Sequence, residues 1–149
     1  MLNNLRNPLA LVGRILLALM FVLAGAAKIG GFAGTVGYMA ANGVPMPNVL
    51  AVLSIVLELG GGLALVFGLY TRWAALALGL FTLLVSFIFH RFWAVPADQE
   101  MVTNLLFMKN ISVAGGMFVL AAFGAGAFSL DAMRSGSGAA NRQDKLRTA

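Results

Sequence analysis

The chain has 149 residues, of which 60% are hydrophobic and only 10% charged, and its formal net charge is +5. Its apolar residues occur in long blocks, which excludes a soluble globular domain and favours an integral membrane protein. The basic charge is explained by membrane topology and not by nucleic-acid binding, because no soluble basic face accompanies it.

Four apolar blocks approach the length of about 20 residues that crosses about 30 Å of hydrocarbon as a helix. Trp73 and Trp93 bracket the third block at the spacing expected of two interfacial aromatic belts. We therefore predict one all-α, integral membrane four-helix bundle within residues 1–130, with helices at about 9–27, 49–69, 73–93 and 105–128.

Threading four helices back and forth collects most basic residues on one side, and the positive-inside rule assigns that side to the cytoplasm. Both termini are then cytoplasmic. Residues 131–149 lack the apolar content to fold, so they are predicted to form a disordered basic cytoplasmic tail. The residues assigned to the cytoplasmic side are Arg6, Arg14, Arg72, Arg134, Arg142, Lys145 and Arg147.

One stripe of the first predicted helix has spacings of four and three residues and contains Arg14, Ala18, Phe21, Gly25 and Lys28. Such a face indicates a retained helix that packs against a neighbour. The segment also has the pattern of a cleavable signal peptide, because arginine precedes an apolar run that ends in small residues. We favour the uncleaved helix; an intact mass for a chain that begins near residue 27 would refute it.

The segment after the first helix is predicted to be a loop that holds a short amphipathic helix at the outer membrane interface. Phe32, Val36 and Met39 have the spacing of one helical face, and Gly43 would end this helix. Two prolines then prevent its continuation before the second membrane helix begins.

Glu58 lies in the middle of the apolar run 49–69, where an unpaired charge costs about 2.5 to 3.5 kcal/mol. It must therefore be paired, protonated or in contact with water. Glycines on both sides of this helix allow close approach of neighbouring helices, so Glu58 is expected to be enclosed by protein. The residues predicted to bring helices together are Gly25, Gly61 and Gly62, and a seam of Gly60, Ala64 and Gly68.

Polar side chains of three other helices are predicted to converge on Glu58 from the outer side. Lys28 ends the first helix, His90 nearly ends the third and Lys109 begins the fourth. We predict a ligand-binding or proton-exchange cluster of Glu58, Lys109, Lys28, His90 and Asn110, with Ser54, Thr82 and Ser86 as neutral neighbours.

Two interpretations of this cluster remain open. Glu58 could form a buried ion pair with Lys109 or Lys28 that only sets helix register. Alternatively, it could be a functional carboxylate, since ionisable groups inside membranes usually mark a site. Lys28 could also extend to the lipid head groups, and His90 could be an interfacial hydrogen-bonding residue beside Trp93.

The chain contains one histidine and no cysteine. This content excludes a bis-histidine haem or a thiolate-held iron–sulfur cluster within the chain, and no metal site is predicted. Any redox role therefore requires a bound cofactor, such as a quinone, or a partner subunit.

The chain resembles the DoxX family of small bacterial inner-membrane proteins in the segments RILLALMFVLAGAAKIGGFAG, YMAANGVPMP, LELGGGLALVFGLYTRWAAL, FIFH and FMKNISVAGG. The resemblance covers residues 14–130 and includes Lys28, Glu58, His90 and Lys109 in this order. It implies a four-helix protein whose namesake is similar to the membrane subunit of a thiosulfate:quinone oxidoreductase, linked to electron transfer into the quinone pool.

The favoured hypothesis is a redox-associated membrane subunit that holds a quinone-like apolar molecule between its helices, with a soluble oxidoreductase as partner. A lysine or His90 would donate a hydrogen bond to a carbonyl oxygen, and Glu58 would exchange the proton. The alternatives are a non-catalytic assembly or scaffold protein and, less favoured, a proton-coupled exporter of small hydrophobic compounds. The oligomeric state stays open.

Overall fold

The computed structural model describes residues 2–136, with the side chains of residues 5–136, and this part of the chain is all-helical as predicted. A further short helical stretch covers residues 130–136. The named elements are α1 (Leu2–Gly30), α2 (Phe32–Ala41), α3 (Pro47–Phe67), α4 (Thr71–Phe89), the 3₁₀ helix η1 (Phe92–Ala94) and α5 (Ala97–Phe123).

Four helices are long and apolar enough to cross a membrane: α1, α3, α4 and α5. Their most apolar segments have mean hydropathies from 1.7 to 2.3. The ten-residue α2 is too short to span and begins at the predicted Phe32. Gly43, just beyond its end, has φ +73°, a conformation that glycine adopts without strain.

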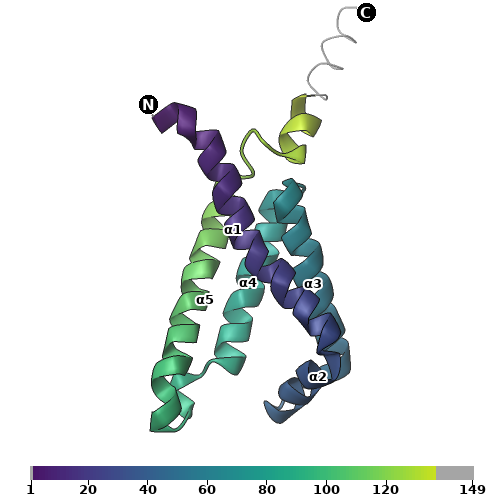
Figure 1. Cartoon of the computed structure of the whole chain (residues 1–149), viewed down its shortest axis with the longest axis vertical. Helices are drawn as coiled ribbons and strands as arrows, with labels where there is room; N and C mark the ends of the chain where they lie inside the picture. The colour runs from purple at the N-terminus through teal and green to yellow at the C-terminus, as the bar shows by residue number, and fades with distance from the viewer. Residues whose placement is uncertain (1, 137–149) are drawn as a thin grey trace, which may run out of the picture.

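The four spanning helices form two closely packed pairs. α1 packs mainly on α3, α4 packs mainly on α5, and α3 joins the pairs through contacts with α4. Residues 2 and 136 lie at the same end of the bundle, which we call the terminal end (Figure 1). Toward the opposite, far end the two pairs diverge, and α2 lies there beside α3 (Figure 1).

The observed helix bounds differ from those predicted, most of all in the first and fourth membrane helices. α1 begins at Leu2 and not at about residue 9, and α4 ends at Phe89 and not at about residue 93. The helix predicted at 105–128 begins at Ala97, because Asp98 and Glu100 in its first turn suit the positive end of a helix dipole although they are not apolar. It ends at Phe123, because Gly124 has φ +84° and leaves the helical conformation. Hydropathy located the apolar part of this helix and missed its polar start.

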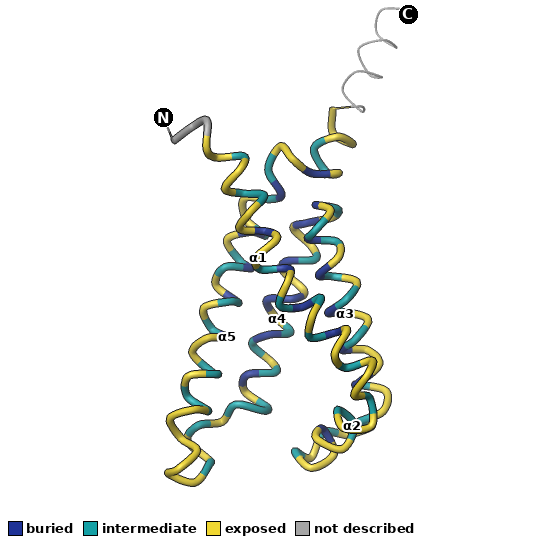
Figure 2. The backbone as a smooth tube through the Cα atoms, viewed as in Figure 1, coloured by how far each residue is buried: buried dark blue, intermediate teal, exposed yellow. Residues whose placement is uncertain are grey.

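The buried core lies where the helix pairs meet (Figure 2). The stripe predicted on α1 faces inward: Arg14, Ala18, Phe21 and Gly25 are buried, and Lys28 is partly buried. The core cluster joins that stripe to side chains of three other helices, among them Leu65, Leu78 and Met117. Many other apolar side chains remain exposed, as expected of helices that face lipid.

Glycines permit the closest helix contacts, although not all the predicted ones do. A Cβ at Gly62 would lie 2.8 Å from Val22 Cγ2, and one at Gly25 would lie 2.7 Å from Leu59 Cγ, so both allow α1 to approach α3. At Gly61 a Cβ would meet Leu78 of α4 at 3.0 Å.

The predicted seam of Gly60, Ala64 and Gly68 is not a helix contact in the described part of the chain. Apart from the adjoining residues and backbone of α3 itself, no described atom lies within 4 Å of a Cβ built at Gly60, which is exposed. Ala64 is only partly buried. Gly68 ends α3 with φ +66°, and its close neighbours are Arg14 and Ser129. Helical periodicity showed that these small residues share one face of α3, but it could not show whether a neighbouring helix packs on that face.

Arg14 is an internal anchor at the terminal end, whereas the sequence predicted its place on the packing stripe and its side of the membrane but not its hydrogen-bond partners. Its side chain is 2% exposed and donates to the backbone oxygens of Ala125 at 2.7 Å and Phe128 at 2.9 Å. A longer contact of 3.4 Å reaches Val66 O at the end of α3. These bonds hold the segment after α5 against α1 and α3.

Asp131 caps the start of α4. Its carboxylate accepts hydrogen bonds from the backbone amides of Tyr70 at 2.8 Å and Thr71 at 2.9 Å. Burial raises the pKa of Asp131, but these hydrogen bonds and the charge of Arg134 outweigh it and hold the pKa below its usual 3.8.

The first part of the predicted disordered tail, residues 131–136, is helical and is attached to the bundle through Asp131. Residues 137–149 of that tail lie outside the described residues.

Candidate ligand-binding site

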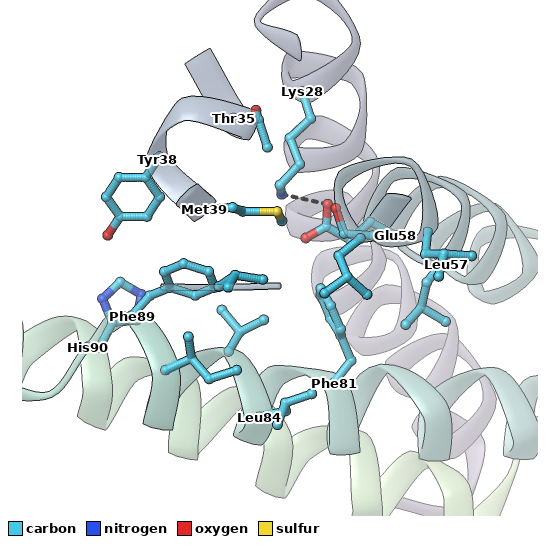
Figure 3. A pocket seen from close by; sticks show the side chains of 16 residues that line it. Lys28, Thr35, Tyr38, Met39, Leu57, Glu58, Phe81, Leu84, Phe89 and His90 are labelled. Carbon is cyan, nitrogen blue, oxygen red and sulfur yellow. Dashed lines mark hydrogen bonds and ion pairs between the residues drawn. The ribbon is translucent and has the colours of Figure 1, made fainter. Parts of the chain in front are cut away.

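A cavity of about 400 Å³ lies toward the far end, between α2, α3 and α4, and we call it the ligand pocket. Its lining is largely apolar, and its few polar groups come from four different helices (Figure 3). The residues that line it are Lys28, Thr35, Tyr38, Met39, Val44, Leu50, Leu53, Ser54, Leu57, Glu58, Phe81, Leu84, Val85, Ile88, Phe89 and His90.

An ion pair between α1 and α3 forms one wall of the ligand pocket. Lys28 Nζ lies 2.6 Å from Glu58 Oε2, and the side chains are 25% and 8% exposed. Figure 3 shows the lysine reaching across to the carboxylate beside the pocket. Lys28 is therefore the cation that neutralises Glu58, which was predicted to pair with either Lys28 or Lys109.

Glu58 is positioned by the inward face of α3. Ala51, Ser54, Glu58, Gly62 and Leu65 recur at spacings of three and four residues, and all are buried. Ser54 also lines the ligand pocket, but its hydroxyl donates to Ala51 O at 2.8 Å in its own helix.

The short helix α2 forms another wall of the ligand pocket. Met39 is its buried residue, and it points toward the Lys28–Glu58 pair in Figure 3. Tyr38 stacks on Phe89 of α4 with a ring-centroid separation of 5.3 Å and an interplanar angle of 23°. This aromatic contact connects α2 to α4 across the pocket.

His90 lies at the end of α4, where its backbone N–H donates to Ser86 O at 3.0 Å. Its imidazole lines the ligand pocket near Tyr38, on the opposite side from Glu58 (Figure 3). The pocket thus has an ion pair at one side and a titratable aromatic ring at the other.

The other predicted members of the cluster lie outside this pocket. Lys109 is exposed on α5, close enough for its charge to act on His90 but not among the lining residues. Asn110 is buried on the inward face of α5, in register with Ala114. α5 packs on α4 and not beside Glu58, so the predicted approach of Lys109 to that carboxylate is wrong.

Thr82 and Ser86 are buried on α4, yet they do not join a shared polar network. The Thr82 hydroxyl donates to Leu78 O and the Ser86 hydroxyl donates to Thr82 O, both at 2.7 Å. Each hydroxyl is satisfied within its own helix, as is common for such residues in membrane helices. Thr82 and Ser86 were predicted to be hydrogen-bonding neighbours of Glu58, but their hydroxyl groups donate within α4 instead.

Sequence reasoning missed the aromatic lining of the ligand pocket. Tyr38, Phe81 and Phe89 lie among many apolar residues, and nothing in their spacing separates a pocket wall from a lipid-facing surface. The amphipathic pattern of α2 was the available signal, because Met39 on its predicted apolar face is buried here.

Among the described residues, no group of three or more histidine, cysteine, aspartate or glutamate side chains could hold a metal ion. What the ligand pocket offers is a lysine ammonium that retains donors beyond its bond to Glu58. A carboxylate and an imidazole, both able to accept or release a proton, lie on either side of an apolar space.

The sequence pattern of the DoxX family matches residues 9–91. The chain belongs to the DoxX family. It is 46% identical over 130 residues to Inner membrane protein YqjF of Escherichia coli (strain K12), covering 87% of this chain and 95% of that protein. It is 39% identical over 126 residues to Inner membrane protein YphA of the same organism, covering 85% and 90%. No solved structure matches this DoxX chain significantly.

The four apolar helices and the inner-membrane relatives identify this DoxX chain as a multi-pass protein of the bacterial inner membrane, as predicted. The matched region includes most of α1 and all of α2 to α4, and it contains every residue that lines the ligand pocket. The residues beyond 91, among them Lys109 and Asn110, lie outside the family match.

Proposed function

We propose that this DoxX protein binds a quinone-like apolar molecule in the ligand pocket and acts as the membrane subunit of a redox complex. One observation carries the proposal: the ion pair Lys28–Glu58 borders a largely apolar cavity within the membrane-spanning part of the chain. An apolar ring with a hydrogen-bond acceptor at its edge matches such a lining.

The size of the ligand pocket supports this ligand class. Its volume of about 400 Å³ falls within the range of about 300 to 1,000 Å³ that small-molecule pockets occupy. Aromatic and aliphatic side chains supply most of its surface, so a flat ring gains affinity by leaving water. The few polar groups then fix its orientation.

The proposed polar contacts use the two sides of the ligand pocket. Lys28 would donate to one carbonyl oxygen, because an ammonium has three donors and Glu58 accepts only one of them here. Glu58 would exchange the proton that accompanies reduction or oxidation of the ligand. His90 would serve the opposite edge of the ring, where it lines the pocket.

Entry from the bilayer is supported by the outer lining of the ligand pocket. Leu53 of α3 and Leu84 of α4 line it and are 55% and 59% exposed. In a membrane-spanning segment, such side chains face lipid. A hydrophobic molecule dissolved in the bilayer would therefore reach the pocket between α3 and α4 without crossing water.

A soluble oxidoreductase remains the proposed partner, because the chain has no cysteine and one histidine and so supplies no redox centre of its own. The family resemblance supports this part of the proposal, and the partner would serve only to supply or accept electrons. Recovery of a soluble redox enzyme with the tagged protein from mild detergent would support it, and recovery of none would remove it.

Isothermal titration calorimetry with a short-chain ubiquinone or menaquinone analogue tests binding. Wild type should bind saturably. Glu58→Gln should weaken binding about tenfold through loss of the proton acceptor and of the Lys28 orientation. Lys109→Ala is the matched control, because it removes an exposed cation outside the pocket and should bind like wild type.

A second variant separates loss of binding from loss of fold. Leu84→Trp enlarges a side chain that is largely exposed at the pocket rim, so it should preserve folding and obstruct the ligand. Folded Leu84→Trp protein with no saturable binding supports the pocket as the site. Absent binding by wild type, or unchanged binding by both pocket variants, would exclude the proposal.

The scaffold alternative has one supporting observation: Lys28–Glu58 joins α1 to α3, which are main packing partners. In that case Lys28→Met combined with Glu58→Leu should preserve fold and partner recovery, and wild type should bind no quinone. The proton-coupled exporter is less favoured, because Glu58 is already neutralised by Lys28. Efflux driven by a pH gradient in proteoliposomes would revive it.

A further inference from the structure

A second cavity, the terminal pocket, lies at the end of the bundle that carries Arg14. Its volume is about 450 Å³, and it lies between the start of α4, the end of α5 and the segment that follows α5. It is separate from the ligand pocket and shares no lining residue with it. The residues that line it are Tyr70, Thr71, Arg72, Trp73, Phe123, Gly124, Ala125, Gly126, Ser129, Asp131, Ala132, Arg134 and Ser135.

The wall of the terminal pocket is held in place from within the bundle. Arg14 binds Ala125 O and Phe128 O from beneath, and Gly124 and Gly126 adopt φ values of +84° and +78°. The segment is also attached to the end of α3, because Asp131 N donates to the carbonyl oxygen of Gly68 at 2.9 Å. These bonds hold this wall of the cavity against α1 and the end of α3.

The charges of the terminal pocket leave an excess of positive charge. Arg72 and Arg134 line it with Asp131 as the carboxylate, but both Asp131 oxygens are bonded to the amides at the start of α4. In residues 5–136 neither arginine forms an ion pair. Arg134 is oriented by Tyr70, whose hydroxyl accepts from it at 3.1 Å and whose ring lies 4.8 Å below it.

Arg72 lies against the backbone turn on the other side of the cavity. A Cβ built at Gly124 would be 3.3 Å from Arg72 Nε, so glycine permits this close approach. Two guanidinium groups thus border one cavity, from α4 and from the helical stretch 130–136. Guanidinium donors match the oxygens of a phosphate group.

Apolar side chains beside these arginines distinguish a lipid from a free anion. Trp73 and Phe123 line the same cavity and are 73% and 77% exposed. They lie in the first turn of α4 and at the end of α5, where spanning helices meet the membrane surface. Tryptophan at that depth is typical of contacts with lipid near the head group.

We propose that the terminal pocket binds the phosphate head group of an anionic phospholipid. Arg72 and Arg134 bind the phosphodiester oxygens, and the acyl chains extend along Trp73 and Phe123. A basic pocket between membrane helices at the membrane surface is a known form of lipid recognition. The site is independent of the ligand pocket and of the proposed quinone function.

Native mass spectrometry of the detergent-purified protein, with phosphatidylglycerol or phosphatidylethanolamine added, tests the site. Wild type should retain one phosphatidylglycerol molecule in preference to phosphatidylethanolamine. Removing a surface-proximal arginine should weaken retention about fivefold, so Arg72→Gln with Arg134→Gln should lower it about 25-fold. Arg91→Gln, which removes an exposed arginine just beyond the other end of α4, is the matched control and should bind like wild type.

Three outcomes would overturn the proposal. An equal loss in Arg91→Gln would mean that lipid responds only to total charge. Displacement of phosphatidylglycerol by millimolar glycerol phosphate would mean that the cavity takes a soluble anion. A circular dichroism melt checks that the double variant is folded, and an unchanged melt is expected because both arginines are exposed. If the folded double variant retains phosphatidylglycerol as well as wild type does, the proposal is also contradicted.

Discussion

Lys28 Nζ lies 2.6 Å from Glu58 Oε2 and joins the end of α1 to the middle of α3. The pair neutralises a carboxylate that lies deep in an apolar helix, and it borders the ligand pocket. The same two side chains therefore have a structural role and a proposed functional role, and variants are needed to distinguish the two roles.

The first prediction concerns the stability of this pair. Glu58→Gln alone leaves a partly buried ammonium unpaired, which should lower the free energy of unfolding by about 3 kcal/mol. Lys28→Met with Glu58→Leu removes both charges and should recover most of that loss, since buried pairs contribute little net stability. Unfolding titrations in mixed detergent micelles measure the stability of both variants. A double variant less stable than Glu58→Gln would contradict the account.

The second prediction concerns Arg14. Arg14→Leu removes charge-assisted hydrogen bonds to Ala125 O and Phe128 O, each worth about 1.5 to 3 kcal/mol. Hydrogen exchange followed by mass spectrometry should then show faster exchange in residues 124–136. Arg6→Leu removes an exposed arginine of the same helix and should leave this exchange unchanged. Equal protection of the segment in Arg14→Leu would exclude the anchor.

The third prediction concerns pH. The folded pKa of Asp131 is lowered, so its carboxylate stabilises the fold above its unfolded pKa, and this contribution is lost as pH falls through the folded value. Melting temperatures of wild type and Asp131→Asn should differ by a constant amount from pH 7 to about pH 5, and the difference should shrink below about pH 4. A difference that stays constant to pH 3 would argue against the capping role.

The fourth prediction compares two glycines of α3. Gly62→Val places atoms against Val22 and the backbone of α1, and overpacking of this kind should destabilise by about 1 to 3 kcal/mol. Gly60→Val introduces the same side chain two residues earlier, where a Cβ would meet no described atom within 4 Å apart from the adjoining residues and backbone of α3. Thermal unfolding should therefore separate the two variants, and equal melting temperatures would show that Gly62 is not a close contact.

Much of this fold follows from the sequence because the membrane restricts the choices. Apolar length identifies the spans, and helical periodicity assigns Arg14 to Lys28 to one inward stripe. The need to neutralise Glu58 also follows from its position, since a lone charge there is costly. These arguments concern one helix at a time, and that explains their success.

The identity of the partners did not follow, because periodicity defines the faces of a helix but not its neighbours. The sequence places Lys28 and Lys109 at similar predicted depth, yet α1 packs mainly on α3 whereas α5 packs mainly on α4. The hydrogen-bond acceptors of Arg14 could not be predicted for the same reason. Its acceptors are backbone oxygens 111 and 114 residues further along, and a carbonyl carries no side-chain signature.

Photo-crosslinking tests the central claim, the ligand pocket, most directly. The protein in lipid nanodiscs would be irradiated with a photoreactive quinone, with or without excess unmodified quinone, and labelled peptides identified by mass spectrometry. The account predicts labels that the competitor removes on pocket residues of α2, α3 and α4, such as Tyr38, Leu57 and Phe81. No competed label, or competed labels only on α5, would contradict it.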